Sequence, residues 1–196
     1  MTPKRTLGEP ADLTGFPAVA PPKRLVRVCR AENATWWFSA DGSRRFDLYP
    51  PDGTCYLATD AYAGIRDATR LGPVSTTWVT GRELRQVSPP DPNARLAATT
   101  RQAAGRYGVT TELATVIPYD LPRRWATAFR AAQFDGIRHQ LRHDQRPRPS
   151  GIALFGSAGP ADLDEGTRTP LTTAEVEAAG VRVLPPPHSS VLTVLP

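Results

Sequence analysis

Several short runs of the chain show the hydrophobic pattern of β-strands. Apolar and polar residues alternate over 24–30 and 136–143, and the runs 53–60 and 151–156 are mainly apolar. Because successive side chains of a strand point to opposite faces, these runs predict strands with at least one buried face. Further strands are expected within 75–87, 181–187 and 189–196, whereas 35–40 is a strand or a buried loop and 110–120 is ambiguous.

Residues that favour helix ends predict two helices. In the segment 61–72, Asp60 precedes the first turn and Gly72 follows the last. An aspartate at that position accepts a hydrogen bond from a free N–H group, and glycine tolerates the left-handed conformation that ends many helices. Residues 92–108 are also expected to be helical, with Gly108 just past the end.

A third helix is predicted over 121–136, because its apolar residues recur every three or four positions. The residues on this apolar face are Leu121, Trp125, Ala128, Phe129 and Ala132. A fourth helix is predicted over 172–180, where Thr172 stands three residues before Glu175, the spacing of a capping box.

The order of these elements predicts one domain of the mixed α+β class. A chain of 196 residues can bury a single substantial core. Strands and helices interleave without the strict alternation of a doubly wound sheet. The 21 prolines cluster between the predicted elements, as expected for loops. We expect residues 1–22 to form a Pro-rich, loosely ordered arm and residues 23–196 to form the domain.

The charge balance favours an anionic partner. The chain has 24 Lys and Arg against 19 Asp and Glu, a formal net charge of +5. A basic protein suits a nucleic acid, a nucleotide or an acidic protein. No run of Lys and Arg typical of nucleic-acid tails is present, so a small phosphate-bearing ligand is favoured over direct nucleic-acid binding. The alternative is that most of these arginines are ordinary surface cations.

The cysteines and histidines do not predict a metal site. Cys29 and Cys55 lie in strand-like apolar runs and are expected to be buried free thiols. His139, His143 and His188 lack the spacing of metal ligands. The sequence also has no apolar run that predicts a membrane span and no visible signal peptide, so we expect a cytoplasmic protein.

No single motif identifies a catalytic site, because nucleotide-binding glycine loops, phosphate loops and nucleophile elbows are missing from the sequence. An ordered set of polar residues remains: Arg27, Arg45, Tyr56 and Asp67. Each also has a structural explanation. An arginine can lie on an exposed sheet face, a tyrosine can belong to the core, and Asp67 can pair with Arg70 three residues on in a helix.

In order, "LVRVCR", "RRFD", "GTCYLATDAYAGIRDA", "WATAFRAAQFDGIRHQLRHD" and "GIALFG" resemble the RES domain family, over residues 24–156. Proteins of this family are commonly toxins of bacterial toxin–antitoxin pairs. The resemblance implies an ADP-ribosyltransferase-like fold with mixed β-sheets and flanking helices. It also implies breakdown of NAD⁺ as substrate, without a metal, and an antitoxin partner with a helix-turn-helix domain.

The same resemblance assigns roles to individual residues. Arg27, Arg45 and Tyr56 match family residues that bind NAD, and Arg27 and Asp67 are the expected catalytic residues. Some positions depart from the family pattern: Ser43 and Arg44 stand where glycines are expected, Asp67 replaces a glutamate, and Leu141 replaces a serine. Ser150 and Ser157 offer hydroxyl groups, but neither is in register with the family serine.

These residue types also suit the expected chemistry. Cleavage of the nicotinamide–ribose bond passes through an oxocarbenium-like state, which a carboxylate stabilises, while arginines bind the pyrophosphate. An aromatic ring can stack on nicotinamide. Two alternatives stay open: transfer of ADP-ribose to a protein, and a catalytically degenerate NAD-binding or regulatory protein. The acceptor, water or phosphate, and the oligomeric state are also open.

Overall fold

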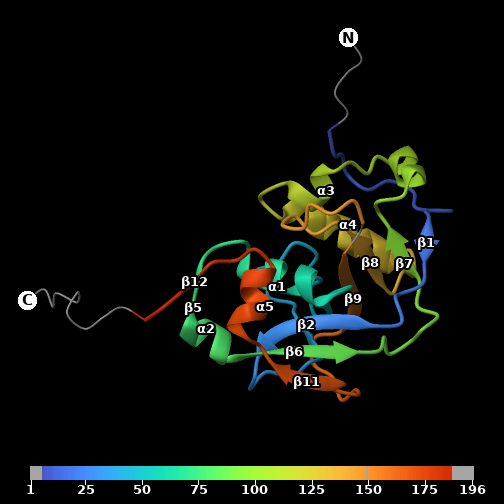
Figure 1. Ribbon diagram of the computed structural model, residues 1–196. Coiled ribbons are helices and arrows are strands. Elements are labelled where there is room, and N and C mark those ends of the chain that lie inside the picture. The colour runs from blue at the N-terminus through green and yellow to red at the C-terminus, as the bar shows by residue number, and fades with distance from the viewer. Residues whose placement is uncertain (1–5, 149, 187–196) are drawn as a thin grey trace, which may run out of the picture.

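The structure is a computed structural model that describes residues 6–148 and 150–186 (Figure 1). Its centre is an eight-stranded sheet with the order β1-β7-β8-β9-β4-β2-β6-β11. Strands β7 and β8 are parallel, and every other pair of neighbours is antiparallel. The eight strands are β1 (Ala18–Val19), β2 (Leu25–Arg30), β4 (Asp52–Ala58), β6 (Arg82–Val87), β7 (Leu96–Ala98), β8 (Gly136–His139), β9 (Gly151–Ser157) and β11 (Thr167–Pro170).

Two small ladders and six helices complete the described part of the chain. Strands β3 (Trp37–Phe38) and β10 (Gly159–Pro160) are antiparallel, and β5 (Val74–Ser75) and β12 (Val183–Leu184) are parallel. The helices are α1 (Ala61–Thr69), α2 (Thr76–Thr80), the 3-10 helix η1 (Gln102–Tyr107), α3 (Glu112–Thr115), α4 (Asp120–Ala131) and α5 (Thr173–Ala178). The mixed α+β class is therefore confirmed. The strand expected over 189–196 lies outside the described residues.

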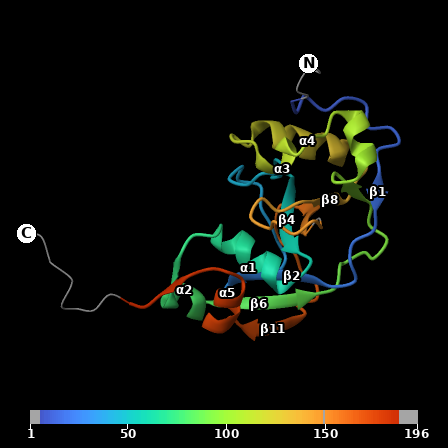
Figure 2. The same ribbon diagram turned by 45° about the horizontal axis from the view of Figure 1, so that its top comes forward.

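The helices form two groups on different parts of the sheet. Helices α3 and α4 lie near β8, whereas α1, α2 and α5 lie beside β2 and β6 (Figures 1 and 2). Helix α1 contacts both β2 and β4, and α4 contacts β8. The space between the two groups faces the middle of the sheet, where β2 and β4 are neighbours.

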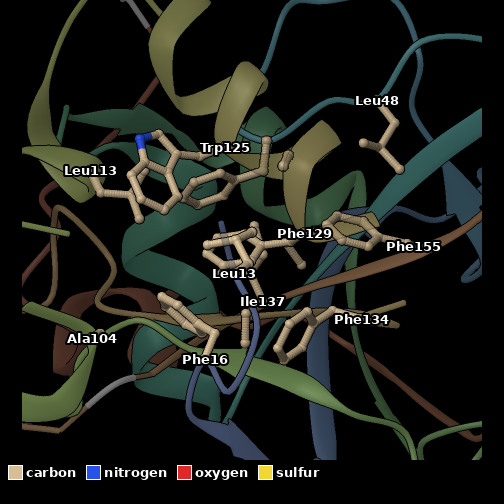
Figure 3. Packing of buried hydrophobic residues seen from close by; sticks show 14 of the residues in the cluster. Leu13, Phe16, Leu48, Ala104, Leu113, Trp125, Phe129, Phe134, Ile137 and Phe155 are labelled. Carbon is tan, nitrogen blue, oxygen red and sulfur yellow. The ribbon is translucent and has the colours of Figure 1, made fainter. Parts of the chain in front are cut away.

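The largest part of the core lies between α4 and the sheet (Figure 3). The apolar face predicted for this helix is confirmed, because Trp125 and Phe129 are completely buried. The Phe129 ring centroid is 4.8 Å from that of Phe16 and 5.6 Å from that of Phe134. Burial of large aromatic side chains is a major favourable contribution to folding, so this contact fixes α4 on the sheet.

The N-terminal segment differs from the expected loosely ordered arm. Within its described part, Leu7, Leu13 and Phe16 are buried in the core against α4. The indole N–H of Trp125 donates to the carbonyl oxygen of Gly8 at 2.9 Å, and β1 pairs with β7. The segment has neither helical nor strand periodicity, but its few apolar side chains fill the space beside the apolar face of α4.

Three other local predictions need correction. Residues 92–108 divide into β7 and the short helix η1, although Gly108 does end η1 in the left-handed conformation. The segment 75–87 contains α2 before β6, because the Ser75 hydroxyl caps a short helix. Helix α1 ends earlier than expected: Arg70 and Leu71 take the left-handed conformation, with φ of 53° and 60°.

Both predicted N-terminal caps are confirmed. Asp60 accepts a hydrogen bond from the backbone N–H of Ala63 at the start of α1. Thr172 and Glu175 form the reciprocal capping box of α5. In residues 6–148 and 150–186, no helix combines the length and the hydrophobicity needed to cross a bilayer.

Candidate functional site

The main cleft opens where the central sheet separates. Strand β4 pairs with β9 along its whole length, but it pairs with β2 only through Val26 and Ala58. Beyond this pair the two strands diverge, and a cleft of about 570 Å³ is lined by residues of both strands. Helix α1 and the segments 43–46 and 139–143 supply further walls. The cleft therefore lies between the two groups of helices.

Arg27, on β2, lies at the point of divergence. Its Nη1 atom donates to the carbonyl oxygen of Thr35 and lies 3.2 Å from the Cys55 sulfur. Cys55 and Tyr56 are successive residues of β4, so their side chains point to opposite faces. Arg27 and Tyr56 therefore approach the cleft from opposite sides of the sheet. Both cysteines are buried free thiols, as expected.

Arg45 is held by the wall that precedes α4. Its Nη1 donates to the carbonyl oxygen of Val116 at 2.8 Å, and its guanidinium lies 4.6 Å from the centre of the Tyr119 ring. Burial lowers the pKa of Arg45 below its ordinary value. Two contacts thus fix this partly buried cation in the cleft, where it can bind an anionic ligand.

Tyr56 has a structural hydroxyl and a ring that lines the cleft. The hydroxyl donates to Asp47 Oδ1 at 2.9 Å and accepts from the backbone N–H of Phe46 at 2.9 Å. Burial, followed by the neighbouring Asp47, raises the pKa of Tyr56 well above 10. The phenol is therefore neutral, and its ring is fixed in orientation. The Arg44 guanidinium lies 5.2 Å from the ring centre.

Asp67 projects from α1 into the same cleft and supplies the single carboxylate among its described lining residues. The side chain is accessible to solvent, but the protein around it raises its pKa by desolvation, while the charges of Arg44, Arg70 and Arg45 act in the opposite direction. Water across the open cleft screens part of both effects. Among the described residues, Asp67 forms no ion pair with Arg70.

Leu141 makes part of the cleft apolar. Its side chain is 6 % exposed and packs in a small cluster with Ala58 and Ala63. Neither Ser150, which is 2 % exposed, nor Ser157 lines the cleft. Among the described residues, the serine that does line it is Ser43, whose backbone N–H donates to Asp41. The described cleft therefore has no serine at the position that the resemblance assigns to one.

His139 is a cleft residue that the sequence placed only within a predicted strand. Its ring is 6 % exposed, packs edge-on against Phe46, and has Nδ1 3.0 Å from the carbonyl oxygen of Gln140. Burial lowers the pKa of His139 to about 4. Among the described residues, its Nε2 has no hydrogen-bond partner. The alternating pattern predicted that one face of this strand is buried. It did not show that His139, on that face, reaches the cleft.

Arg44, Tyr119 and Arg142 were also not identified from the sequence as site residues. They belong to loops, where periodicity gives no orientation, and they reach the cleft only through the tertiary fold. The described residues contain no cluster of three or more histidine, cysteine or acidic side chains suited to a metal.

The four residues singled out from the sequence thus line one cleft. No family model matches the chain, and no curated protein matches it. A chain of the crystal structure of the M. tuberculosis MbcT–MbcA toxin–antitoxin complex is similar, with 15 % sequence identity and a TM-score of 0.61. The match covers 85 % of this chain and 93 % of that chain. At this identity the likeness shows that the protein has the fold of a chain of that toxin–antitoxin complex.

Proposed function

We propose that this protein is a toxin-type enzyme of the RES kind that breaks the nicotinamide–ribose bond of NAD⁺. One observation carries the proposal: Arg27, Arg45, Tyr56 and Asp67 come from four separate segments and line one cleft. The fold shared with a chain of a toxin–antitoxin complex supports the toxin role. The sequence resemblance supplies NAD⁺ as the substrate.

The proposed reaction begins with rupture of the bond between the ribose C1′ and the nicotinamide nitrogen. The electron pair of this bond moves to the positively charged pyridinium ring, which leaves as neutral nicotinamide. Positive charge then develops on C1′ and the ring oxygen, and the Asp67 carboxylate stabilises it. An oxygen of water or phosphate forms the new bond to C1′. Water then releases its proton to solvent, whereas a phosphate anion can attack directly.

The arginines position the dinucleotide in this proposal. Arg27 and Arg45 bind the pyrophosphate, because guanidinium groups form paired, charge-assisted hydrogen bonds with phosphate oxygens. Nicotinamide stacks on the Tyr56 ring and takes the place of the exposed Arg44 guanidinium. The neutral phenol does not compete with Asp67 for the developing positive charge.

A second candidate is a catalytically degenerate NAD-binding protein, and Leu141 favours it. Its buried side chain stands in the cleft at the position of the family serine and cannot donate a hydrogen bond. In this case the cleft binds NAD⁺ without cleavage.

We also propose an antitoxin protein as partner, because the similar chain belongs to a toxin–antitoxin complex. Following the resemblance, this partner has a helix-turn-helix domain and blocks the cleft. Co-expression with the product of a neighbouring gene tests this part: the proposal requires a stable complex and suppressed turnover.

The decisive experiment measures nicotinamide release from NAD⁺, with and without phosphate, by the purified protein. We expect release by the wild type and its loss in Asp67→Ala, with NAD⁺ affinity measured in parallel. Dependence on phosphate identifies the acceptor. Bound but uncleaved NAD⁺ supports the degenerate protein, and gain of release in Leu141→Ser then identifies the missing hydroxyl as the cause. A folded wild type that neither binds nor cleaves NAD⁺ overturns both candidates.

A further inference from the structure

The cleft contains a group of basic side chains that the proposed reaction does not use. Arg70 follows α1, and Arg142 and His143 follow β8; all three line the cleft. Arg70 and Arg142 are exposed, and among the described residues their guanidinium groups form no hydrogen bond or ion pair with a carboxylate. These cations are therefore available to a ligand.

The backbone that carries this group is held firmly. Arg66 of α1 donates from Nε to the carbonyl oxygen of His143 at 2.6 Å and from Nη1 to that of Ala179 at 3.0 Å. Arg146 forms ion pairs with Asp60 at 3.0 Å and Asp144 at 2.7 Å. The segment after β8 is thus attached to α1 through Arg66 and to the N-terminal cap of α1 through Asp60.

The end of α1 also has an unusual conformation. Arg70 and Leu71 are consecutive non-glycine residues in the left-handed region. Residues other than glycine, asparagine and aspartate seldom adopt this backbone conformation, and those that do are often found at functional sites. This turn places the Arg70 side chain on the cleft wall after the helix ends.

The cleft carries more positive charge than is needed to bind one pyrophosphate group. Among the described residues, seven arginines line it, against the single carboxylate of Asp67. Arg27 and Arg45 suffice for the pyrophosphate in the proposed function, and Asp67 faces the cationic nicotinamide ribose. Unpaired cations repel one another when they gather in one cleft, so a second anion there is stabilised electrostatically.

We propose that Arg70, Arg142 and His143 form a second anion subsite, which binds the 2′-phosphate of a phosphorylated nicotinamide dinucleotide. The inference rests on the proposed function and adds substrate choice to it: the NADP⁺ class is preferred over NAD⁺. Arginine is the side chain that other dinucleotide-binding proteins use to accommodate a 2′-phosphate. A phosphate monoester offers three oxygens to the two guanidinium groups, and the imidazole adds a further N–H donor.

The test uses two ligands that differ by one phosphate and do not react. Calorimetric titration compares adenosine 2′,5′-bisphosphate with adenosine 5′-monophosphate. The wild type is expected to bind the bisphosphate at least about tenfold more tightly, as a charge-assisted hydrogen bond predicts. Arg142→Gln and Arg70→Gln each reduce this preference, with little change in affinity for the monophosphate. Arg148→Gln, an exposed arginine of the same segment outside the cleft lining, is the matched control.

The outcomes separate this inference from the proposed function. Equal affinity of the wild type for both ligands, or a preference that survives both variants, overturns the subsite while leaving the nucleotide cleft in place. Failure of a folded wild type to bind either ligand overturns both. The last arm of the test measures the rate of NAD⁺ cleavage with and without inorganic phosphate. If phosphate accelerates cleavage by the wild type but not by Arg142→Gln, and NADP⁺ is not cleaved faster than NAD⁺, the subsite binds free phosphate and the inference is wrong.

Discussion

Arg85 donates a hydrogen bond from Nη1 to the hydroxyl oxygen of Thr35 at 2.9 Å. The carbonyl oxygen of the same threonine accepts the hydrogen bond of Arg27 at the edge of the cleft. Arg85 is completely buried and also contacts Glu83 and Glu165, both at 3.1 Å. The ionic network around the buried Arg85 therefore positions Thr35, whose carbonyl oxygen holds a proposed NAD-binding residue, Arg27.

Arg85→Met should destabilise the protein strongly. It leaves Glu83 and Glu165 without their buried cation and removes the hydrogen bonds to Thr35 and to the carbonyl oxygens of Asn33 and Ala31. Leaving a buried hydrogen-bonding group without its partner costs about 1–3 kcal/mol for each group. Urea unfolding measures the loss of stability, and dinucleotide titration at low temperature should show weaker binding, since Arg27 loses its fixed acceptor.

Arg168→Met is the matched control for this prediction. Arg168 also contacts Glu83, at 2.9 Å, and the carbonyl oxygen of Ala31, at 2.8 Å, but its side chain is largely exposed. An exposed ion pair contributes about 0–1 kcal/mol, so this variant should unfold close to the wild type. Similar losses in both variants would contradict the role assigned to burial.

Tyr56→Phe separates the structural hydroxyl from the proposed binding ring. The variant removes a donor from buried Asp47 and an acceptor from the Phe46 N–H, which should lower stability by about 1–3 kcal/mol. The aromatic ring remains, so the KM for the dinucleotide should change less than about threefold, a difference below one kcal/mol. Thermal unfolding and steady-state kinetics check both parts. Tyr56→Leu is the contrasting variant, because it removes the ring and should raise KM.

Asp67 should control the acid limb of the pH–rate profile. Its carboxylate must be ionised to stabilise the developing cation, and its pKa lies above the ordinary 3.8 because of desolvation. Activity should therefore fall with acidification at a pH above 3.8. Asp67→Asn should reduce kcat at least about a hundredfold, as loss of an electrostatic stabiliser does in other enzymes.

The stability of the Asp67 variants gives an independent check. The folded-state pKa of this acid is raised, so folding disfavours its ionised form, and the penalty is present above that pKa and absent at acid pH. Asp67→Asn should therefore be more stable than the wild type at neutral pH. Below the pKa of an unfolded aspartate, this difference in stability should disappear. Asp67→Glu, which keeps the charge, should retain activity. A fully active Asp67→Asn contradicts the proposed mechanism.

The sequence predicted best those elements whose side chains divide cleanly between a buried and an exposed face. The spacing of the apolar residues of α4 predicted both that the segment is a helix and which face is buried. Strands β2, β4 and β9 were recognisable from short apolar or alternating runs. The segment 92–108 was misjudged because three buried residues of β7 are too few to show a strand period. Phe16 was missed because isolated apolar residues in a Pro-rich segment carry no periodic signal.

The candidate site was predicted in part for a similar reason. Arg27, Tyr56 and Asp67 were found because they stand on recognisable elements in a family-like order. Arg85 looks like any other arginine of an alternating strand, and only the tertiary fold brings Glu165 and Thr35 to it. The contacts that join distant segments depend on chain packing, which local patterns do not encode.

His139 should make the stability of the protein depend on pH above the range where aspartates titrate. Its pKa is lowered from 6.5 to about 4 by burial, with a smaller contribution from Arg45. The unfolded chain therefore binds a proton more readily, so stability is complete above pH 6.5 and decreases as the pH falls towards 4. One pKa unit corresponds to about 1.4 kcal/mol, so the full loss is at most about 3.5 kcal/mol. Urea unfolding between pH 4.5 and pH 7.5, a range chosen around these pKa values, measures it.

The His139→Gln variant isolates this contribution, because glutamine does not titrate. Its stability should be lower than that of the wild type at neutral pH and should change less on acidification, so the two curves converge. His143→Gln is the matched control: its pKa is also lowered by burial, but the ring is only partly buried, so the convergence should be smaller. Parallel curves for the wild type and His139→Gln would show that the imidazole binds protons equally in the folded and the unfolded chain, which contradicts a pKa lowered by burial. In that case the cleft would gain a cation beside Arg45 only below the ordinary histidine pKa of 6.5.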